Sequence, residues 1–279
     1  MDVLIIGAGR VGSSFGFLLN QSQFFTIVGV YNRHYESASK AVKKIGDGLP
    51  LDKSSLKATA ERADLIVITT PDDIIREVAE TVNNYNLKNT AIIMHMSGLH
   101  SSDILNTDNN INRLFSLHPL QAIPDFKEGV KLLPETTYTL EGNTEGLKQG
   151  KKIIEKLGFN YYVIETEYKP LYHAAAVFAS NYLVSLLDIS FELLREADIL
   201  NSDIKKGLFK LVYGTLENVD ELGTKSALTG PIARGDFETI KKHQDALNDY
   251  KSSYLALYNL LGSYTADMVN RKDLKEMLD

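Results

Sequence analysis

A run of apolar, mostly small residues at 174–179 is flanked by side chains that can transfer a proton. Four polar residues lie on one side of the helix predicted there, at spacings of four, seven and one: Lys169, His173, Ser180 and Asn181. His or Lys with a pKa near neutrality can protonate a carbonyl or imine that accepts a hydride. The alternative is a core histidine whose hydrogen-bonding needs, like those of Asn181, are met by a neighbouring helix.

Ser97 and His118 are the two other candidates for this chemistry. Ser97 follows a strand predicted at 90–95 and precedes Gly98, which lets a ligand approach the backbone. His118 directly follows another predicted strand, 113–117, and Pro119 restricts it to an extended conformation. We therefore expect both side chains at a ligand-binding edge of the sheet, with Ser97 also contacting the cofactor and His118 as a second candidate proton donor.

Neither metal nor thiol chemistry is expected. The chain has no cysteine, and His95 and His100 have no acidic companions at metal-ligand spacing. We interpret both histidines as structural or loop residues. Any chemistry must therefore use other side chains or a bound cofactor.

A glycine-rich turn near the N-terminus predicts that cofactor. The short apolar strand expected at 2–6 leads into a GxGxxG turn, and a helical pattern follows at 10–20. The three glycines permit the tight turn, the approach of a pyrophosphate and close helix packing, while the helix N-terminus stabilises the anion. The predicted cofactor-binding residues of the turn are Gly7, Ala8, Gly9, Arg10, Val11 and Gly12.

The end of the second predicted strand, 26–31, indicates which dinucleotide is bound. A carboxylate at this position would bind the ribose of NAD, but Asn32 and Arg33 follow the strand instead. Arg33 is suited to a 2′-phosphate and Asn32 to a hydrogen bond with it, so NADP is favoured over NAD. Alternatively, Arg33 is a solvated loop residue.

Thr70 ends a third predicted strand, 64–70, and Pro71 follows it at the same edge of the sheet. They are expected to line the cofactor. The sequence equally fits a proline turn in which Asp72 caps the next helix. One stretch can serve both purposes.

Strand-like and helix-like segments alternate through residues 1–165, which predicts an α/β fold with a Rossmann-type, doubly wound and mostly parallel sheet. Strands are predicted at 2–6, 26–31, 64–70, 90–95, 113–117, 136–141 and 160–164, and helices at 10–20, 35–46, 73–83 and 144–157. A short strand near Leu49 and a helix near Leu56 would complete the alternation. These residues form the predicted dinucleotide-binding domain.

Residues 166–279 are predicted to form a second, all-α domain. Its helices are expected at 170–198, 201–222, 236–248 and 250–270, with an irregular connection at 223–235. The core face is expected at Leu183, Leu186, Leu187, Leu193 and Leu194. Within the connection, Arg234 could clamp a substrate carboxylate, or Asp236 could cap the helix that follows.

Composition argues against several classes of partner. The formal net charge is −6 and no basic stripe is present, which argues against nucleic acid. No continuous apolar run approaches the roughly 18 residues that span a bilayer, so no membrane partner is expected. The first residues enter a strand directly, so no signal peptide is expected. A soluble cytoplasmic protein is predicted.

Taken together, the chain resembles a family of Rossmann-like oxidoreductases that carry a C-terminal domain of unknown function 2520. The resemblance is carried by the glycine turn and by seven further stretches: Asn32-Arg33, Thr70-Pro71-Asp72, Ser97-Gly98, 116–120, 172–176, Ser180-Asn181 and 229–236. The layout is more distantly similar to pyrroline-carboxylate reductases, ketopantoate reductases, and 6-phosphogluconate and β-hydroxyacid dehydrogenases. The resemblance therefore implies a helical domain of the 6-phosphogluconate-dehydrogenase-like type.

The relatives bind NADP(H) in the first domain and dimerise through the helical one, so the resemblance also implies a homodimer. Hydroxyacid relatives place a Lys, and four residues later an Asn, at the start of the first long helix. Lys169 fits this pattern, but His173 occupies the fourth position and Asn181 comes two turns later. The resemblance leaves the substrate class open and directs attention to His173.

The sequence thus favours an NADPH-dependent oxidoreductase that reduces a small carbonyl or imine compound bound between the two domains. His173 or Lys169 would protonate the product heteroatom and Asn181 would orient the substrate, while Ser97 and His118 would complete the site. The rival hypothesis is a non-catalytic NADP(H)-binding regulatory or interaction module, because Rossmann folds host both.

Overall fold

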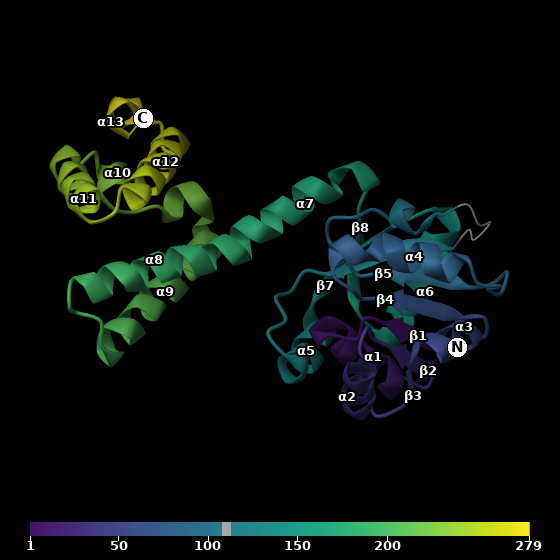
Figure 1. Cartoon of the computed structure of the whole chain (residues 1–279). Helices are drawn as coiled ribbons and strands as arrows, with labels where there is room; N and C mark the ends of the chain where they lie inside the picture. Colours follow the sequence, from purple (N-terminus) through teal and green to yellow (C-terminus); the bar gives the residue numbers. More distant parts are fainter. Residues whose placement is uncertain (108–112, 279) are drawn as a thin grey trace. The chain divides into compact units, whose positions relative to one another are not determined.

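The computed structural model describes residues 1–107 and 113–278. The chain divides into two compact units, Met1–Tyr182 and Leu183–Asp279 (Figure 1). The first unit contains a β-sheet with helices, and the second is helical. The expected α/β arrangement followed by an all-α domain is therefore present.

The sheet of the first unit has eight strands in the order β3-β2-β1-β4-β5-β6-β7-β8. The strands are β1 (Asp2–Ile6), β2 (Thr26–Tyr31), β3 (Leu49–Leu51), β4 (Leu65–Ile68), β5 (Ile92–His95), β6 (Leu114–Pro119), β7 (Thr137–Gly142) and β8 (Asn160–Val163). All neighbouring strands are parallel except β6 and β7, which are antiparallel. This order confirms the doubly wound, mostly parallel sheet, including the short strand expected near Leu49.

Helices cover both faces of this sheet (Figure 1). One face carries α1 (Arg10–Gln21), α2 (Tyr35–Ile45) and α6 (Thr144–Leu157), and the other carries α3 (Lys53–Ala60) and α4 (Ile75–Asn83). Short 3₁₀ turns occupy Asp72–Ile74, Ser102–Leu105, Leu133–Glu135 and Thr166–Tyr168. Helix α5 (Phe126–Leu132) was not expected, although Asp125 caps it by accepting the Glu128 amide.

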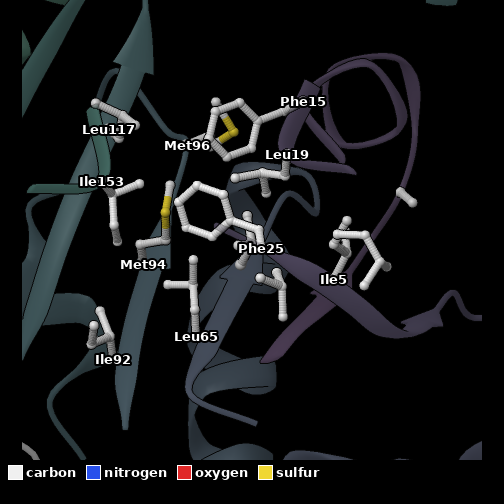
Figure 2. Packing of buried hydrophobic residues seen from close by; sticks show 14 of the residues in the cluster. Ile5, Phe15, Leu19, Phe25, Leu65, Ile92, Met94, Met96, Leu117 and Ile153 are labelled. Carbon is white, nitrogen blue, oxygen red and sulfur yellow. The ribbon is translucent and has the colours of Figure 1, made fainter. Parts of the chain in front are cut away.

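Alternating side chains of the central strands enter two separate hydrophobic cores. Val3 and Ile5 of β1 face the core under α1 and α2, while Leu4 and Ile6 face the core under α3 and α4. Figure 2 shows the first core, with Ile5, Phe15, Leu19, Phe25, Leu65, Ile92, Met94, Met96, Leu117 and Ile153 labelled. Burial on both faces explains why these strands are continuous apolar runs in the sequence.

A π-helical turn interrupts the long helix expected at 170–198. The chain forms α7 (Lys169–Ala176), a π-helical segment (Val177–Asn181) and α8 (Tyr182–Glu196) without leaving the helix. The Tyr182 amide donates to the Val177 carbonyl, which is the five-residue spacing of a π-helix. A periodicity argument based on 3.6 residues per turn does not detect this extra residue.

By length and composition alone, the 31-residue stretch Thr166–Glu196 could cross a membrane. It has a mean hydropathy of 1.5 over its most apolar window, and none of that window is buried. The sequence had suggested no membrane span, because charged and polar residues interrupt every continuous apolar run. A single helix of this kind is weak support for a membrane span, since helices that pack against other protein pass the same test.

The second unit has its core at its C-terminal end. Its further helices are α9 (Ser202–Ala227), α10 (Pro231–Arg234), α11 (Phe237–Tyr250), α12 (Ser252–Met268) and α13 (Lys272–Leu278). The buried cluster consists of Ile240, Ala266, Leu274 and Leu278. The prediction that a leucine face of this helix forms the core is wrong, because α8 has no buried residue and Leu186 is 39% exposed.

The connection expected at 223–235 is more helical than predicted. Helix α9 continues to Ala227 past a kink at Gly223, where φ is 75°. A glycine tolerates this left-handed value, so the kink does not end the helix. Asp236 caps α11 by accepting the Thr239 amide at 3.1 Å, which confirms the capping role considered for it.

Candidate functional site

The glycine turn after β1 is shaped by contact with the end of β4. The Gly7 amide donates to the Tyr31 carbonyl at 2.8 Å, and Gly7 has a φ of +89°. A Cβ on Gly7 would lie 2.7 Å from the Thr70 nitrogen, and one on Gly12 would lie 2.1 Å from Thr69 Oγ1. These two glycines are therefore required by packing within the protein.

Gly9 differs from the other two glycines because its Cβ position is open. The nearest atom would be the Gly7 carbonyl oxygen at 3.9 Å. Gly9 is also the N-cap of α1, and no side chain caps that helix. The first amides of α1, beginning at Arg10, are thus available to an anion.

The two other residues of the turn have additional contacts. Arg10 Nη1 donates to the Pro124 carbonyl at 3.4 Å, so its side chain leans toward the segment before α5. Val11 packs against the first hydrophobic core. Both contribute to the turn through their backbone position.

A pocket of about 470 Å³, here termed the glycine-turn pocket, lies beside this turn. It brings together five of the predicted cofactor-binding residues: Gly7, Asn32, Arg33, Thr70 and Pro71. Its lining also includes His34 and Ser37, which the sequence did not single out. Thr70 Oγ1 is buried and has no hydrogen-bond partner in the part of the chain that the structure describes. A polar ligand would satisfy that hydroxyl.

Asn32 and Asp72 have other roles than those considered for them. Asn32 Oδ1 accepts the Ala8 amide at 2.7 Å, so this side chain holds the glycine turn. No side chain caps the 3₁₀ turn Asp72–Ile74 or α4, so the capping role of Asp72 is wrong. Arg33 provides a positively charged side chain to the lining of the glycine-turn pocket.

His95 organises the loop after β5. Its Nδ1 accepts the Ser97 amide, and its Nε2 donates to the Ser101 carbonyl, each at 3.1 Å. Burial, with a smaller contribution from the charge of Lys169, lowers the pKa of His95 to about 3. The neutral ring can make both bonds at once, so His95 is the structural residue expected from the sequence.

Ser97 and Gly98 bring this loop against two further histidines. Ser97 Oγ accepts the amides of Leu99 and His100, each at 3.1 Å, so the hydroxyl shapes the turn. A Cβ on Gly98 would lie 2.7 Å from His173 Nδ1 and 2.9 Å from His118 Nε2. Only glycine allows this approach, and both ring nitrogens face it.

A second pocket of about 560 Å³, here termed the histidine pocket, contains three of the predicted catalytic residues. His118, His173 and Asn181 all line it, together with Tyr172 and Ser180. His118 Nδ1 and the Tyr172 hydroxyl are 2.9 Å apart, and the two histidine rings meet edge to face at 5.9 Å. All of these residues belong to the first unit.

The two histidines of this pocket have different surroundings. Burial lowers the pKa of His118 to about 4, with smaller contributions from the charges of Lys169 and His173. Burial also raises the pKa of Tyr172. His173 Nδ1 is buried without a hydrogen-bond partner among the described residues. At neutral pH, His118 is therefore a neutral hydrogen-bonding group, and His173 has an unused ring nitrogen.

Lys169 lies apart from the histidine pocket, although His173 is only four residues away. Its side chain is fully buried and is not part of the pocket lining. Its Nζ donates to Ser116 Oγ at 2.6 Å, and Glu141 is its nearest carboxylate. Burial lowers the pKa of Lys169 to about 8, against the opposing charges of Glu141 and Asp72.

Three residues of this region were not selected as candidates from the sequence: Tyr172, Ser116 and Glu141. Tyr172 stands next to His173 in the stretch that carries the family resemblance, and this position was the available signal. Ser116 likewise lies in a stretch that carries the resemblance, 116–120. Glu141 lies inside a strand and its partners come from distant segments, so no local pattern indicates its role.

The two pockets lie along one edge of the sheet. Gly7 follows β1, Thr70 follows β4, Ser97 follows β5, and His118 lies at the end of β6. Three strand spacings of about 4.8 Å separate β1 from β6. The carboxyl edge of an open α/β sheet is where ligands bind, so one extended dinucleotide could span both pockets.

Two family models match consecutive parts of the chain. A Rossmann-like domain matches residues 1–119, and a domain of unknown function, DUF2520, matches residues 136–265. No curated protein sequence matches the chain. The expected family resemblance is thus confirmed at the level of both domains.

Solved structures share the fold over nearly the whole chain. A protein described as an NADP oxidoreductase from Bacteroides fragilis is 24% identical, with a TM-score of 0.77 over 95% of this chain and 98% of its own. An imine reductase from a Pseudomonas species is 20% identical, with a TM-score of 0.61 over 96% and 94%. The Plasmodium falciparum pyrroline carboxylate reductase with NADP bound is 14% identical, with a TM-score of 0.53 over 96% and 98%. At these identities, the likeness shows a common dehydrogenase-type fold.

Proposed function

Because the chain combines a Rossmann-like domain with a DUF2520 domain, we propose that it is an NADPH-dependent oxidoreductase acting on a small carbonyl or imine compound. The observation that carries this proposal is the histidine pocket, which lies on the same sheet edge as the glycine-turn pocket. Solved proteins of the same fold include an imine reductase, which agrees with the proposed reaction type.

The glycine-turn pocket has the features needed to hold the dinucleotide. The uncapped N-terminus of α1 would bind the pyrophosphate, and Gly9 leaves room for its approach. The unpartnered Thr70 hydroxyl would donate to or accept from the bound cofactor. Arg33 would pair with a 2′-phosphate, which favours NADPH over NADH. The bound cofactor supplies the hydride.

The side chains of the histidine pocket would bind the substrate and supply the proton. In our proposal, Tyr172 donates to His118 Nδ1, so that Nε2 carries the proton and binds the substrate heteroatom. His173, which lines the pocket, would transfer a proton from its ring to the oxygen or nitrogen as the hydride reaches the carbon. Asn181 and Ser180 would orient the substrate.

The decisive experiment measures NADPH oxidation with a panel of small carbonyl and imine compounds. We expect turnover with at least one compound, and a decrease in kcat of about 10²- to 10³-fold in His173→Ala, with unchanged NADPH affinity. The matched control is His243→Ala, since His243 lies on α11 and bonds to Tyr258. NADPH binding without oxidation of any panel compound would favour the non-catalytic binding module instead.

We further propose that the chain forms a soluble cytoplasmic homodimer through its helical part. Within the second unit, α8 and α9 have no buried residue, yet they carry large exposed apolar side chains. Val184 and Leu211 are both 66% exposed, and Tyr213 is 60% exposed. Apolar surface of this extent marks an interaction site, and covering it with a second copy would remove it from water.

The oligomeric state is testable by light scattering after size exclusion. We expect twice the chain mass of 31.1 kDa for the wild type. Leu211→Glu and Val184→Glu place a charge on the apolar faces and should shift the mass toward the monomer. Lys206→Glu, a charge change at an exposed position of the same helix α9, is the control. A wild-type monomer at micromolar concentration would overturn the dimer.

A further inference from the structure

A buried ion pair lies behind the histidine pocket. The side chains of Lys169 and Glu141 are only 1% and 3% exposed, and Lys169 Nζ is 3.9 Å from Glu141 Oε2. The same ammonium group donates to Ser116 Oγ at 2.6 Å and to the Ser97 carbonyl at 3.3 Å. All of its contacts are therefore with the protein interior.

Glu141 connects the pair to two other segments. Its Oε2 accepts the Ser102 amide at 2.8 Å, and its Oε1 accepts the hydroxyls of Ser102 at 2.9 Å and Thr166 at 3.0 Å. The carboxylate thus accepts three hydrogen bonds besides its ion pair. Buried charges are tolerated when they are paired and hydrogen-bonded in this way.

The pair holds both ends of the loop that carries Gly98. Lys169 binds the carbonyl of Ser97, and Glu141 binds the backbone and side chain of Ser102. Between these two points, Gly98 meets the ring nitrogens of His173 and His118. The position of the loop against the histidines therefore depends on groups that never enter the pocket.

We propose that Lys169 and Glu141 are positioning residues, which hold the Ser97–Ser102 loop so that Gly98 supports His118 and His173, and that Lys169 does not itself protonate the substrate. This inference rests on the proposed reductase function for its kinetic consequences. Its structural content concerns only the loop and can be tested without a substrate.

Geometry decides against Lys169 as the acid. A general acid must lie within hydrogen-bond distance of the reacting atom, directly or through one water. Lys169 Nζ is enclosed by Ser97, Ser116 and Glu141 and has no place in the pocket lining. Its lowered pKa of about 8 would suit an acid, but burial is the main cause and acts equally on a structural lysine.

The charge of Lys169 also affects His118 directly. After burial, this charge is the largest cause of the lowered pKa of His118, followed by the charge of His173. The Tyr172 hydroxyl is the third group facing the ring. The positive charge behind the pocket thus helps to keep His118 in the neutral form that binds a substrate heteroatom.

The first test measures amide hydrogen exchange of residues 97–102 by mass spectrometry. Lys169→Met, Glu141→Gln and the double variant should each accelerate exchange in this segment by at least tenfold, because one or both attachments are lost. The double variant has no buried unpaired charge, so it provides the test if either single variant folds poorly. Lys88→Met, which breaks the Asp64 ion pair elsewhere in the first unit, should leave the segment unchanged. Unchanged exchange in the double variant would overturn the proposal.

The second test compares kcat across pH with the best compound of the panel. If the pair positions the loop, both single variants should lose kcat by similar factors, and the double variant should be no worse. The decrease in kcat on the alkaline side of the pH profile should then persist in every variant. If Lys169 is the acid, Lys169→Met should lose more kcat than Glu141→Gln, which should change little, and the alkaline decrease near pH 8 should disappear in Lys169→Met. The latter pattern would overturn the proposal. If no compound is turned over, the proposed function fails, while hydrogen exchange still decides the role of the pair.

Discussion

The two pockets of the first unit are built in different ways. The glycine-turn pocket depends on backbone groups: an uncapped helix N-terminus and glycines that pack against β4. The histidine pocket depends on side chains from two separate segments, which are the end of β6 with the residues after it, and α7 with the π-helical turn. The loop after β5 contributes Gly98, which packs against the two histidines. A backbone site is fixed by a short stretch of sequence, whereas a side-chain site depends on how distant segments meet.

The largest effect of a substitution is expected at Gly98, the glycine against which the histidines of the histidine pocket pack. Gly98→Ala would place a methyl group 2.7 Å from His173 Nδ1 and 2.9 Å from His118 Nε2, so both rings must move. We expect kcat to fall about 10²- to 10³-fold, since a displaced general acid loses most of its contribution. NADPH affinity, measured by fluorescence titration, should stay near the wild-type value. An equal loss of affinity and kcat would remove the distinction between the two pockets.

Within the glycine turn, substitution should separate packing from cofactor binding. Gly12→Ala meets Thr69 Oγ1 at 2.1 Å and should lower the free energy of unfolding by about 1–3 kcal/mol, because overpacking forces side chains to shift. Gly9→Ala has open space and should leave stability unchanged while weakening NADPH binding. Urea denaturation and cofactor titration of both variants test this. The reverse assignment would show that Gly9 has a packing role.

Lowering the pH should destabilise the folded protein through the buried histidines in and beside the histidine pocket. The pKa values of His118 and His95 are about 4 and about 3, below the ordinary value of 6.5. The unfolded chain therefore binds more protons than the folded chain as pH falls below 6.5, and the free energy of unfolding decreases down to those lower values. Each histidine should contribute about 2 kcal/mol to this loss by about pH 5.

Urea denaturation at neutral pH and near pH 5 measures this dependence. His118→Asn keeps a polar atom near the position of Nδ1 and should remove part of the dependence. His243→Asn, which changes an exposed histidine of α11, is the matched control. Equal pH dependence in all three proteins would contradict the lowered pKa of His118.

The smallest expected effect concerns the cofactor. Arg33→Ala should reduce the ratio of NADPH to NADH affinity by about tenfold or more, as loss of one charge-assisted bond to a phosphate implies. Arg62→Ala, an exposed arginine outside the glycine-turn pocket, is the control. An unchanged ratio in Arg33→Ala would show that Arg33 does not recognise the 2′-phosphate.

Much of the fold was predictable because its signals are local. The expected strands and the helix starting at residue 10 appear within a few residues of their predicted bounds, since apolar runs and periodicity reflect burial on the two faces of the sheet. Helix α5 was missed because it has only seven residues. The leucine face of α8 was misassigned because periodicity reports an apolar surface but not what covers it.

The sequence by itself determined the strand–helix alternation of the mostly parallel sheet, the helical character of the residues that follow it and the glycine turn, because each depends on residues that are neighbours along the chain. Only the tertiary structure decided how the polar side chains are used. Lys169 and His173 stand four residues apart on one helix, yet strands β6 and β7 bury the lysine while the histidine lines a pocket. A helical spacing places residues on one side of a helix, but the segments that pack against that side determine what chemistry each residue can do.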